Sequence, residues 1–213
     1  ISSAAFFMVL GTILPNSRIL IKNISLNPSR TGIIKVLKRM GSDIRMSGNR
    51  AAGFEPIGDI IIKSSKLKRA VIKKKEIPSL IDELPILMVA ACFAEGKSVF
   101  EGVSELRVKE TDRISSMSEN LKKMGADIRV ISATSRGGSA KTFGGKTART
   151  EKIIIRGGTP LIGAAVRSFG DHRTAMSMVV AGLAAQGKTR IDNISCINKS
   201  FPNFLSLLKT IIQ

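Results

Sequence analysis

The chain has 213 residues, of which 43% are hydrophobic, so it can bury a substantial core and is not a disordered segment. It has no apolar run long enough to span a bilayer, no signal-peptide pattern and no metal-ligand spacing around Cys92 and Cys196, so we expect a cytoplasmic protein. The formal net charge of +18 favours anionic partners, whereas the absence of Trp and Tyr argues against base stacking on nucleic acid.

One pattern occurs three times along the chain, in copies at about residues 1–80, 81–170 and 171–213. Each copy opens with an almost uniformly apolar run, which predicts buried helices over residues 4–10, 85–91 and 176–182. Segments that predict strands follow, at residues 19–25, 98–104 and 189–195. A second, amphipathic helix is expected next, ending near residues 40, 124 and 208. Gly41 and Gly125 follow the first two of these helices, where a left-handed C-cap is favoured.

Short apolar strands complete the first two copies. Residues 44–46 are expected to pair with residues 60–62, and residues 128–130 with residues 153–155. The unit is therefore helix, strand, helix, strand, strand, which predicts the α/β class. The lysines at residues 73–75 predict a solvated loop, and the glycine pairs at 137–138 and 144–145 predict a loop that matches neither a P-loop nor a dinucleotide fingerprint.

The expected helix starts carry most of the polar residues of interest. Three buried helices would begin near residues 2–3, 82 and 172–173, and three amphipathic helices near residues 29–31, 109–111 and 199–200. If the copies pack around a pseudo-three-fold axis, these starts lie together at one end. Helix N-termini attract anions through unpaired N–H groups and a positive dipole end, so with Lys109, Arg113, Arg173 and Lys199 they would form an anion site.

The segment 107–113, with the sequence RVKETDR, is a candidate part of that site. Lys109 and Arg113 are four residues apart and would share a helix face, while Glu110 is placed to hydrogen-bond Arg113. An arginine oriented in this way suits a carboxylate or phosphate ligand. A solvated helix face with ordinary ion pairs is the alternative interpretation.

Asp82 and His172 stand at two of the expected helix starts. Asp82 precedes an apolar run with Pro85 in its first turn, so it is either a helix N-cap or a general base and hydroxyl acceptor in an arginine-rich cleft. His172 is the only histidine of the chain, and both a structural and a catalytic role remain open.

Several motifs together resemble the 3-phosphoshikimate 1-carboxyvinyltransferase family, also called 5-enolpyruvylshikimate-3-phosphate synthases. They are DELP at residues 82–85, FAEG at 93–96, ELRVKETDR at 105–113, DHR at 171–173 and SFP at 200–202, in family order over essentially the whole chain. Residues 27–32 further resemble the branch that includes glyphosate-tolerant bacterial enzymes. The resemblance implies repeated βαβαββ units around a pseudo-three-fold axis, with buried helices inside and mixed sheets outside.

The resemblance also implies an activity and a set of residue roles. Family members transfer the enolpyruvyl group of phosphoenolpyruvate to the 5-hydroxyl of shikimate 3-phosphate and release phosphate. Asp82, Glu110 and His172 match catalytic positions, Asp82 and Lys109 match shikimate 3-phosphate ligands, and Arg113, Arg173 and Lys199 match phosphoenolpyruvate ligands. No metal or organic cofactor is expected.

The family further implies that the chain is one domain of a two-domain enzyme, monomeric at full length, whose opposing N-terminal domain lies outside these residues. The first residue, Ile1, agrees with a piece of a longer protein, and we expect this piece alone to be inactive. Two alternatives are a UDP-N-acetylglucosamine enolpyruvyl transferase, of the same fold, and a basic nucleic-acid-binding module.

Overall fold

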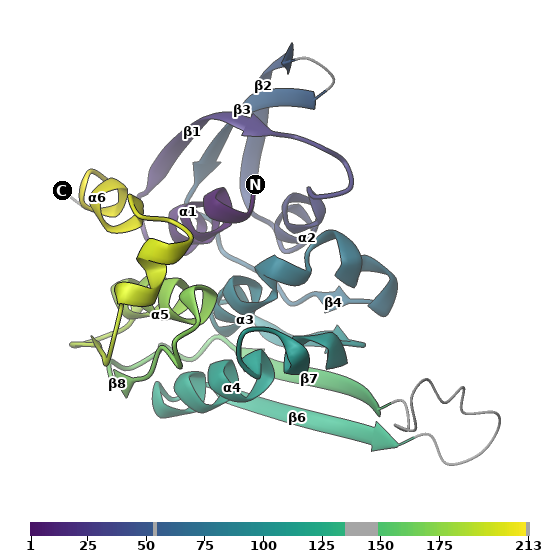
Figure 1. Cartoon of the computed structure of the whole chain (residues 1–213), viewed down its shortest axis with the longest axis vertical. Helices are drawn as coiled ribbons and strands as arrows, with labels where there is room; N and C mark the ends of the chain where they lie inside the picture. Colours follow the sequence, from purple (N-terminus) through teal and green to yellow (C-terminus); the bar gives the residue numbers. More distant parts are fainter. Residues whose placement is uncertain (53–54, 135–148, 212–213) are drawn as a thin grey trace.

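The structure is a computed structural model that describes residues 1–52, 55–134 and 149–211 (Figure 1). Its α-helices are α1 (Ser2–Ile13), α2 (Gly32–Arg39), α3 (Leu84–Cys92), α4 (Arg113–Lys123), α5 (His172–Ala184) and α6 (Phe204–Lys209). Its strands are β1 (Arg18–Ser25), β2 (Asp43–Ala52), β3 (Glu55–Lys63), β4 (Val71–Ile72), β5 (Gly96–Glu101), β6 (Asp127–Thr134), β7 (Arg149–Gly157), β8 (Ala165–Val166) and β9 (Arg190–Ile191). Short 3-10 helices are η1 (Lys74–Ser79), η2 (Ile81–Glu83), η3 (Ser104–Val108) and η4 (Ser195–Lys199).

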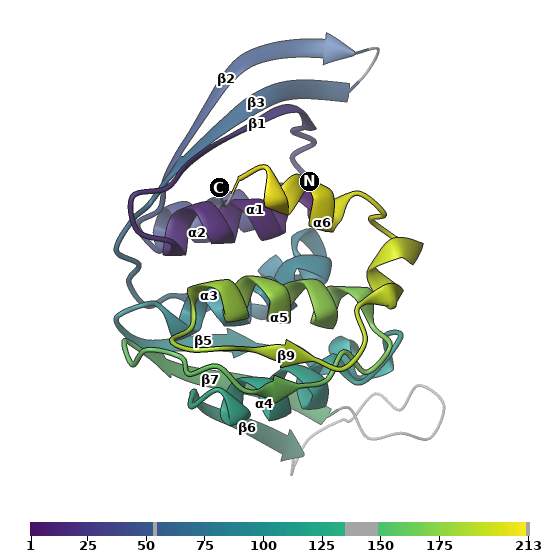
Figure 2. The same ribbon diagram turned by 90° about the vertical axis from the view of Figure 1, so that its left-hand side faces the viewer.

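In the part of the chain that the structure describes, the strands form three sheets, in the orders β1-β3-β2, β4-β5-β7-β6 and β8-β9. The predicted strand pairs are confirmed, since Ile44 lies opposite Ile62 and Ile128 opposite Ile155 in antiparallel ladders. Strands β4 and β5 pair in parallel, as do β8 and β9, so the sheets are mixed. Figure 2 shows helices between the β1-β3-β2 sheet and the four-stranded sheet, which agrees with the expected α/β architecture.

Helices α1, α3 and α5 occupy the centre and pack against one another. Every residue of α3 is buried, and the middle of α1 is equally enclosed. A helix that is apolar on all sides is stable only when it is surrounded, because any exposed face would leave apolar surface in water. The three apolar runs are therefore the core, as predicted, and each opens one copy of the repeat.

Glycines end the second helices of the first two copies as predicted. Gly41 has a φ of 94° and Gly125 a φ of 88°, in the left-handed region where a side chain would be strained. Lys73, Lys74 and Lys75 are exposed as expected, although Lys74 and Lys75 begin η1 instead of a loop. The glycine pairs at 137–138 and 144–145 lie outside the described residues.

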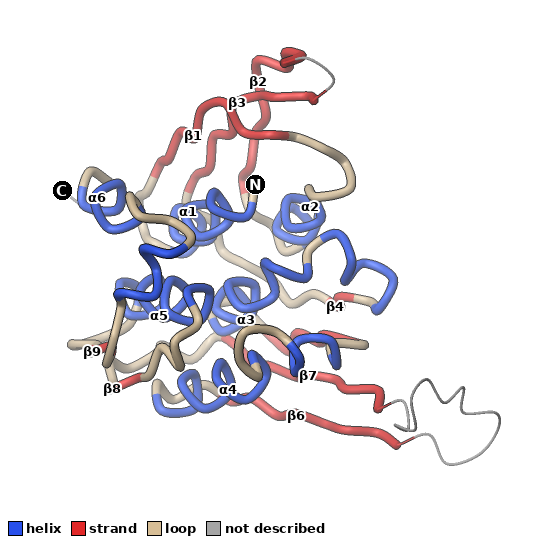
Figure 3. The backbone as a smooth tube through the Cα atoms, in the orientation of Figure 1, coloured by secondary structure: helices blue, strands red, loops and turns tan. Residues whose placement is uncertain are grey.

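The predicted start of α4 was wrong. The helix begins at Arg113, because the side chain of Asp112 caps it by accepting a hydrogen bond from the Ser115 backbone nitrogen at 3.0 Å. Lys109 and Glu110 therefore lie in the loop between η3 and α4, drawn in tan in Figure 3. Consequently Lys109 and Arg113 do not share a helix face.

The third copy also departs from its expected boundaries. Helix α6 begins at Phe204 and not near Lys199, which instead ends η4. Pro202 explains the delay, because proline disfavours helical backbone in the residue before it. The strand of this copy shrinks to Arg190–Ile191. Within the described ranges, none of the helices combines the length and apolarity needed to cross a bilayer.

Candidate functional site

Asp82 lies where residues from all three copies of the repeat meet. It belongs to η2, directly before α3. The N-cap position of α3 is Glu83, so of the two interpretations left open for Asp82 the N-cap role was wrong. Its Oδ2 is 3.3 Å from Nη2 of Arg30, of the first copy, and 3.3 Å from Nη2 of Arg173, of the third. Its Oδ1 is 3.8 Å from Nη1 of Arg113, of the second. Three arginines from three copies thus surround one carboxylate.

Arg113 is the most deeply buried of these arginines, with 1% of its side chain exposed. Its Nε donates to Asp171 Oδ2 at 2.7 Å, and its Nη2 donates to Glu110 Oε2, as the sequence predicted. Among the described residues, Nη1 has no hydrogen-bond partner, since Asp82 is too distant for one. A buried guanidinium therefore keeps one donor available beside Asp82.

Asp171 fixes this arginine and also begins α5. The carboxylate is fully buried, and its Oδ1 accepts a hydrogen bond from the Arg173 backbone nitrogen at 2.9 Å, which caps the helix. Sequence reasoning gave Asp171 no role. An aspartate directly before an apolar helix is the signal for its capping role, but nothing local indicates its contact with Arg113, 58 residues away.

Arg173 and His172 follow on the first turn of α5. Arg173 donates from Nη1 to the Asp82 backbone oxygen at 3.0 Å, and burial lowers its pKa while Asp82 opposes that change. The His172 Nδ1 is 3.9 Å from Asp171 Oδ1. Burial also lowers the pKa of His172, against the opposing effect of Asp171, so the neutral imidazole is favoured at neutral pH.

Glu83 is a second buried carboxylate that the sequence analysis missed. It is 2% exposed and accepts a hydrogen bond from Ser2 Oγ at 2.5 Å. Burial raises its pKa, while the Ser2 hydrogen bond and Arg173 oppose the rise. The start of α1 is thereby connected to the start of α3.

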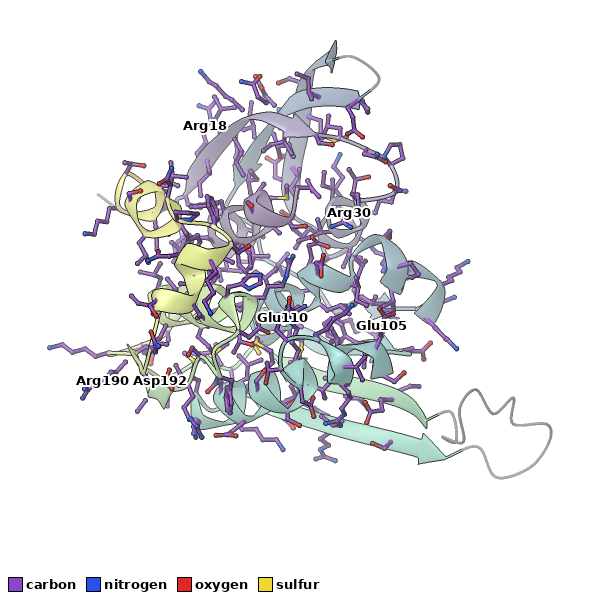
Figure 4. The ribbon with its side chains drawn as sticks, viewed as in Figure 1. Arg18, Arg30, Glu105, Glu110, Arg190 and Asp192 are labelled. Atoms are coloured by element: carbon purple, nitrogen blue, oxygen red, sulfur yellow. The ribbon has the colours of Figure 1, made fainter. Side chains whose placement is uncertain are left out.

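The two lysines of the predicted site do not join this cluster. Lys109 Nζ pairs with Glu105 Oε1 at 3.0 Å, and Lys199 is exposed at the end of η4. Figure 4 shows Arg30 beside α2 and Glu110 near the centre of the view, with Glu105 farther out on η3. The structure thus brings together Asp82, Glu110, Arg113, His172 and Arg173 of the seven predicted residues.

Arg107, which precedes the loop that carries Lys109 and Glu110, anchors this segment to the sheet. Its Nε and Nη2 donate to the buried carboxylate of Glu151 on β7, at 2.9 to 3.0 Å. Its Nη1 donates to Asp112 Oδ2 at 2.6 Å, so one guanidinium joins the sheet to the cap of α4. Arg107 is a structural anchor that sequence reasoning had not separated from the rest of the motif.

The arrangement suits an anionic ligand that can compete with protein carboxylates for arginine. Arg113 and Arg173 face Asp82 at the starts of α4 and α5, where helix dipoles add positive potential. Adjacent carboxylates supply groups that can accept and return protons. No set of three His, Cys, Asp or Glu side chains within the described ranges is grouped as metal ligands would be.

Comparison with known proteins identifies the family. Residues 1–208 match the sequence profile described as EPSP synthase (3-phosphoshikimate 1-carboxyvinyltransferase). The chain belongs to the EPSP synthase family. A 3-phosphoshikimate 1-carboxyvinyltransferase of Desulforamulus reducens is 47% identical over 212 residues, which are 100% of this chain and 45% of that protein. A second, of Citrifermentans bemidjiense, is 45% identical over 213 residues and is covered to 46%.

Solved structures of EPSP synthases agree with this result. The chain superposes on EPSP synthase of Acinetobacter baumannii with a TM-score of 0.85 and 39% identity, over 99% of this chain and 45% of that one. The enolpyruvyl transferase NikO of Streptomyces tendae shares the fold at a TM-score of 0.68 and 15% identity. The chain therefore spans about half the length of the EPSP synthases that it matches.

Proposed function

We propose that this chain is the C-terminal domain of a two-domain EPSP synthase. The complete protein would transfer the enolpyruvyl group of phosphoenolpyruvate to the 5-hydroxyl of shikimate 3-phosphate, with release of phosphate, on the route to chorismate. Family membership supports the reaction, and the convergence of Arg30, Arg113 and Arg173 on Asp82 supports the site. The strongest support for an anion site comes from the buried Arg113, whose Nη1 has no hydrogen-bond partner among the described residues.

Arg113 and Arg173 are the proposed receptors for the carboxylate and phosphate of phosphoenolpyruvate. Guanidinium groups pair with such planar or multiply charged anions through two parallel hydrogen bonds. In the structure Arg113 contacts Asp82, Glu110 and Asp171, and Arg173 contacts Asp82, so a bound anion must replace some of those contacts. Lys199, exposed at the end of η4, would approach the donor phosphate when the substrates are enclosed.

Asp82 is the proposed acceptor of the 5-hydroxyl proton, and Lys109 the proposed contact for the phosphate of shikimate 3-phosphate. Glu110 would handle the proton at the methylene carbon of phosphoenolpyruvate, with neutral His172 as its neighbour. Protonation of that carbon creates positive charge at the adjacent centre. The carboxylates stabilise this charge while the arginines hold the anionic ends of the donor. These groups complete the reaction without a metal or organic cofactor.

The opposing N-terminal domain is the proposed partner of residues 1–213, and it would close the site from the other side. We further propose that the complete enzyme is a cytoplasmic monomer. The free thiols of Cys92 and Cys196 support a reducing compartment.

Phosphate release tests the proposal in the full-length protein, that is, this chain with whatever sequence its gene encodes beyond Ile1 and Gln213. Release that requires both phosphoenolpyruvate and shikimate 3-phosphate is expected, and UDP-N-acetylglucosamine should not replace the acceptor. Asp82→Asn and Arg113→Lys should each lower kcat/KM by about a hundredfold or more. Arg39→Gln, which breaks the exposed pair with Glu76, is the control and should leave activity unchanged. The 213-residue chain alone should show no turnover.

Two results would overturn the proposal. One is release that depends on UDP-N-acetylglucosamine, which would favour the related transferase. The other is full activity in Asp82→Asn together with Arg113→Lys, because the site would then lie elsewhere. Turnover by the isolated chain would overturn only the requirement for a second domain.

A further inference from the structure

Arg30 contacts Asp82 although the expected site residues do not include it. It lies in the turn before α2, with half of its side chain exposed, and its Nη2 is 3.3 Å from Asp82 Oδ2. The same nitrogen is 3.4 Å from Ser2 Oγ, which in turn donates to Glu83. Arg30 therefore connects the starts of α1 and α2 to the carboxylates that precede α3.

The turn that carries Arg30 is built to present it. The Asn27 side chain accepts hydrogen bonds from the Ser29 nitrogen at 3.0 Å and the Ser29 hydroxyl at 2.8 Å. The Asn27 side-chain amide donates to the Glu55 carboxylate on β3 at 3.1 Å. The Arg30 backbone nitrogen donates to the Asn27 backbone oxygen at 2.9 Å. Such an Asx-turn fixes the backbone that leads up to the arginine.

Arg30 and Arg113 lie at nearly equivalent positions of the first two copies of the repeat. Met40-Gly41 and Met124-Gly125 end α2 and α4 in equivalent places, and counting back from them puts Arg30 one residue after the equivalent of Arg113. The first two copies thus use almost the same place in the unit to aim an arginine at Asp82. Arg113 faces Oδ1, whereas Arg30 and Arg173 share Oδ2.

We propose that Arg30 is a positioning residue that orients the Asp82 carboxylate for its part in the reaction, an inference that rests on the proposed function. With Oδ2 held from two sides, the plane of the carboxylate is fixed and Oδ1 stays directed toward the available Nη1 of Arg113. Loss of Arg30 leaves Arg173 as the partner of Oδ2 and lets the carboxylate rotate.

The first test measures kcat and KM in the full-length protein. Arg30→Gln should lower kcat by about tenfold, because a reacting group held in the wrong orientation slows the chemical step. The KM for phosphoenolpyruvate should change much less. Arg30→Lys should recover part of the loss, since an ammonium can still donate to Oδ2. Arg39→Gln removes a different exposed arginine, at the end of α2, and should leave kcat unchanged.

A double-mutant cycle with Asp82→Asn separates positioning from a direct ligand contact. If Arg30 acts through Asp82, Arg30→Gln should change kcat/KM by less than about twofold in the Asp82→Asn background. If the two losses multiply, Arg30 acts independently of Asp82 and the inference is overturned. An unchanged kcat in Arg30→Gln also overturns it.

The cycle also distinguishes this inference from the proposed function. If Asp82→Asn is fully active, the role of Asp82 itself fails. If Asp82→Asn is impaired while Arg30→Gln is not, only the positioning role of Arg30 fails. Thermal unfolding of each variant shows whether a loss of activity merely reflects a loss of folded protein.

Discussion

Arg113 Nε and Asp171 Oδ2 lie 2.7 Å apart, and both side chains are almost completely enclosed. The pair joins the first residue of α4 to the cap of α5, and so joins the second copy of the repeat to the third. A charge in such a place is stable only while its partner is present, because water cannot replace the lost interaction.

Asp171→Asn should therefore destabilise the protein by about 3 kcal/mol. Asparagine is as good an N-cap as aspartate, so the loss reports the ion pair and not the end of the helix. Denaturant unfolding measures it. Glu119→Gln is a suitable control, because it breaks an exposed pair with Lys123 and should cost less than about 0.5 kcal/mol. Equal losses in the two variants would contradict the assignment.

Arg107 should contribute to stability and not only to the sequence motif. Arg107→Gln removes the main hydrogen-bond donors to the Glu151 carboxylate, which is 3% exposed. The Ser132 hydroxyl then remains as a donor to that carboxylate. We expect a loss of about 2 kcal/mol in the free energy of unfolding, typical of a buried charge deprived of its hydrogen bonds. Adding Glu151→Gln should restore part of that loss, because the amide is uncharged. A further loss of stability in the double variant would show that the broken Arg107–Glu151 contact is not the cause.

Much of this fold was predictable from local pattern. The apolar runs of α1, α3 and α5 and the pairing of Ile44 with Ile62 follow from hydrophobic periodicity and from the internal repeat. The start of α4 was not, because Thr111 and Asp112 are both good caps and only the folded loop decides between them. Because Asp112 is the N-cap, α4 begins at Arg113 and Lys109 lies in the preceding loop.

The contacts of the site were less predictable than its members. Glu110 with Arg113 is a short-range pair, and the sequence indicated it correctly. Arg30 with Asp82 and Arg113 with Asp171 join residues more than fifty positions apart, so they depend on how the copies pack. Sequence patterns carry no direct record of such contacts.

Glu83 should make stability depend on pH. Its folded pKa is raised above 4.5 by burial, so the folded protein binds more protons than the unfolded chain as the pH rises past that value. The contribution of this group is fully present below pH 4.5 and is lost as the pH rises through the folded pKa. The difference in melting temperature between Glu83→Gln and the wild type should therefore shift in favour of the variant as the pH rises from about 4 to 7. A difference that is constant, or that falls with pH, would contradict the assignment.

Glu105 should compete with a phosphate ligand for Lys109. The two side chains pair at 3.0 Å with an i,i+4 spacing, and Glu105 is largely exposed. If Lys109 contacts the phosphate of shikimate 3-phosphate, as we propose, the ion pair must break on binding, at a cost of about 0.3–0.5 kcal/mol. Glu105→Gln should then lower the KM for shikimate 3-phosphate by about twofold, and Lys109→Gln should raise it far more. Glu119→Gln frees Lys123 from a similar i,i+4 pair on α4 and should leave this KM unchanged. If Glu105→Gln instead raises the KM as Lys109→Gln does, the ion pair orients the lysine for the ligand and does not compete with it.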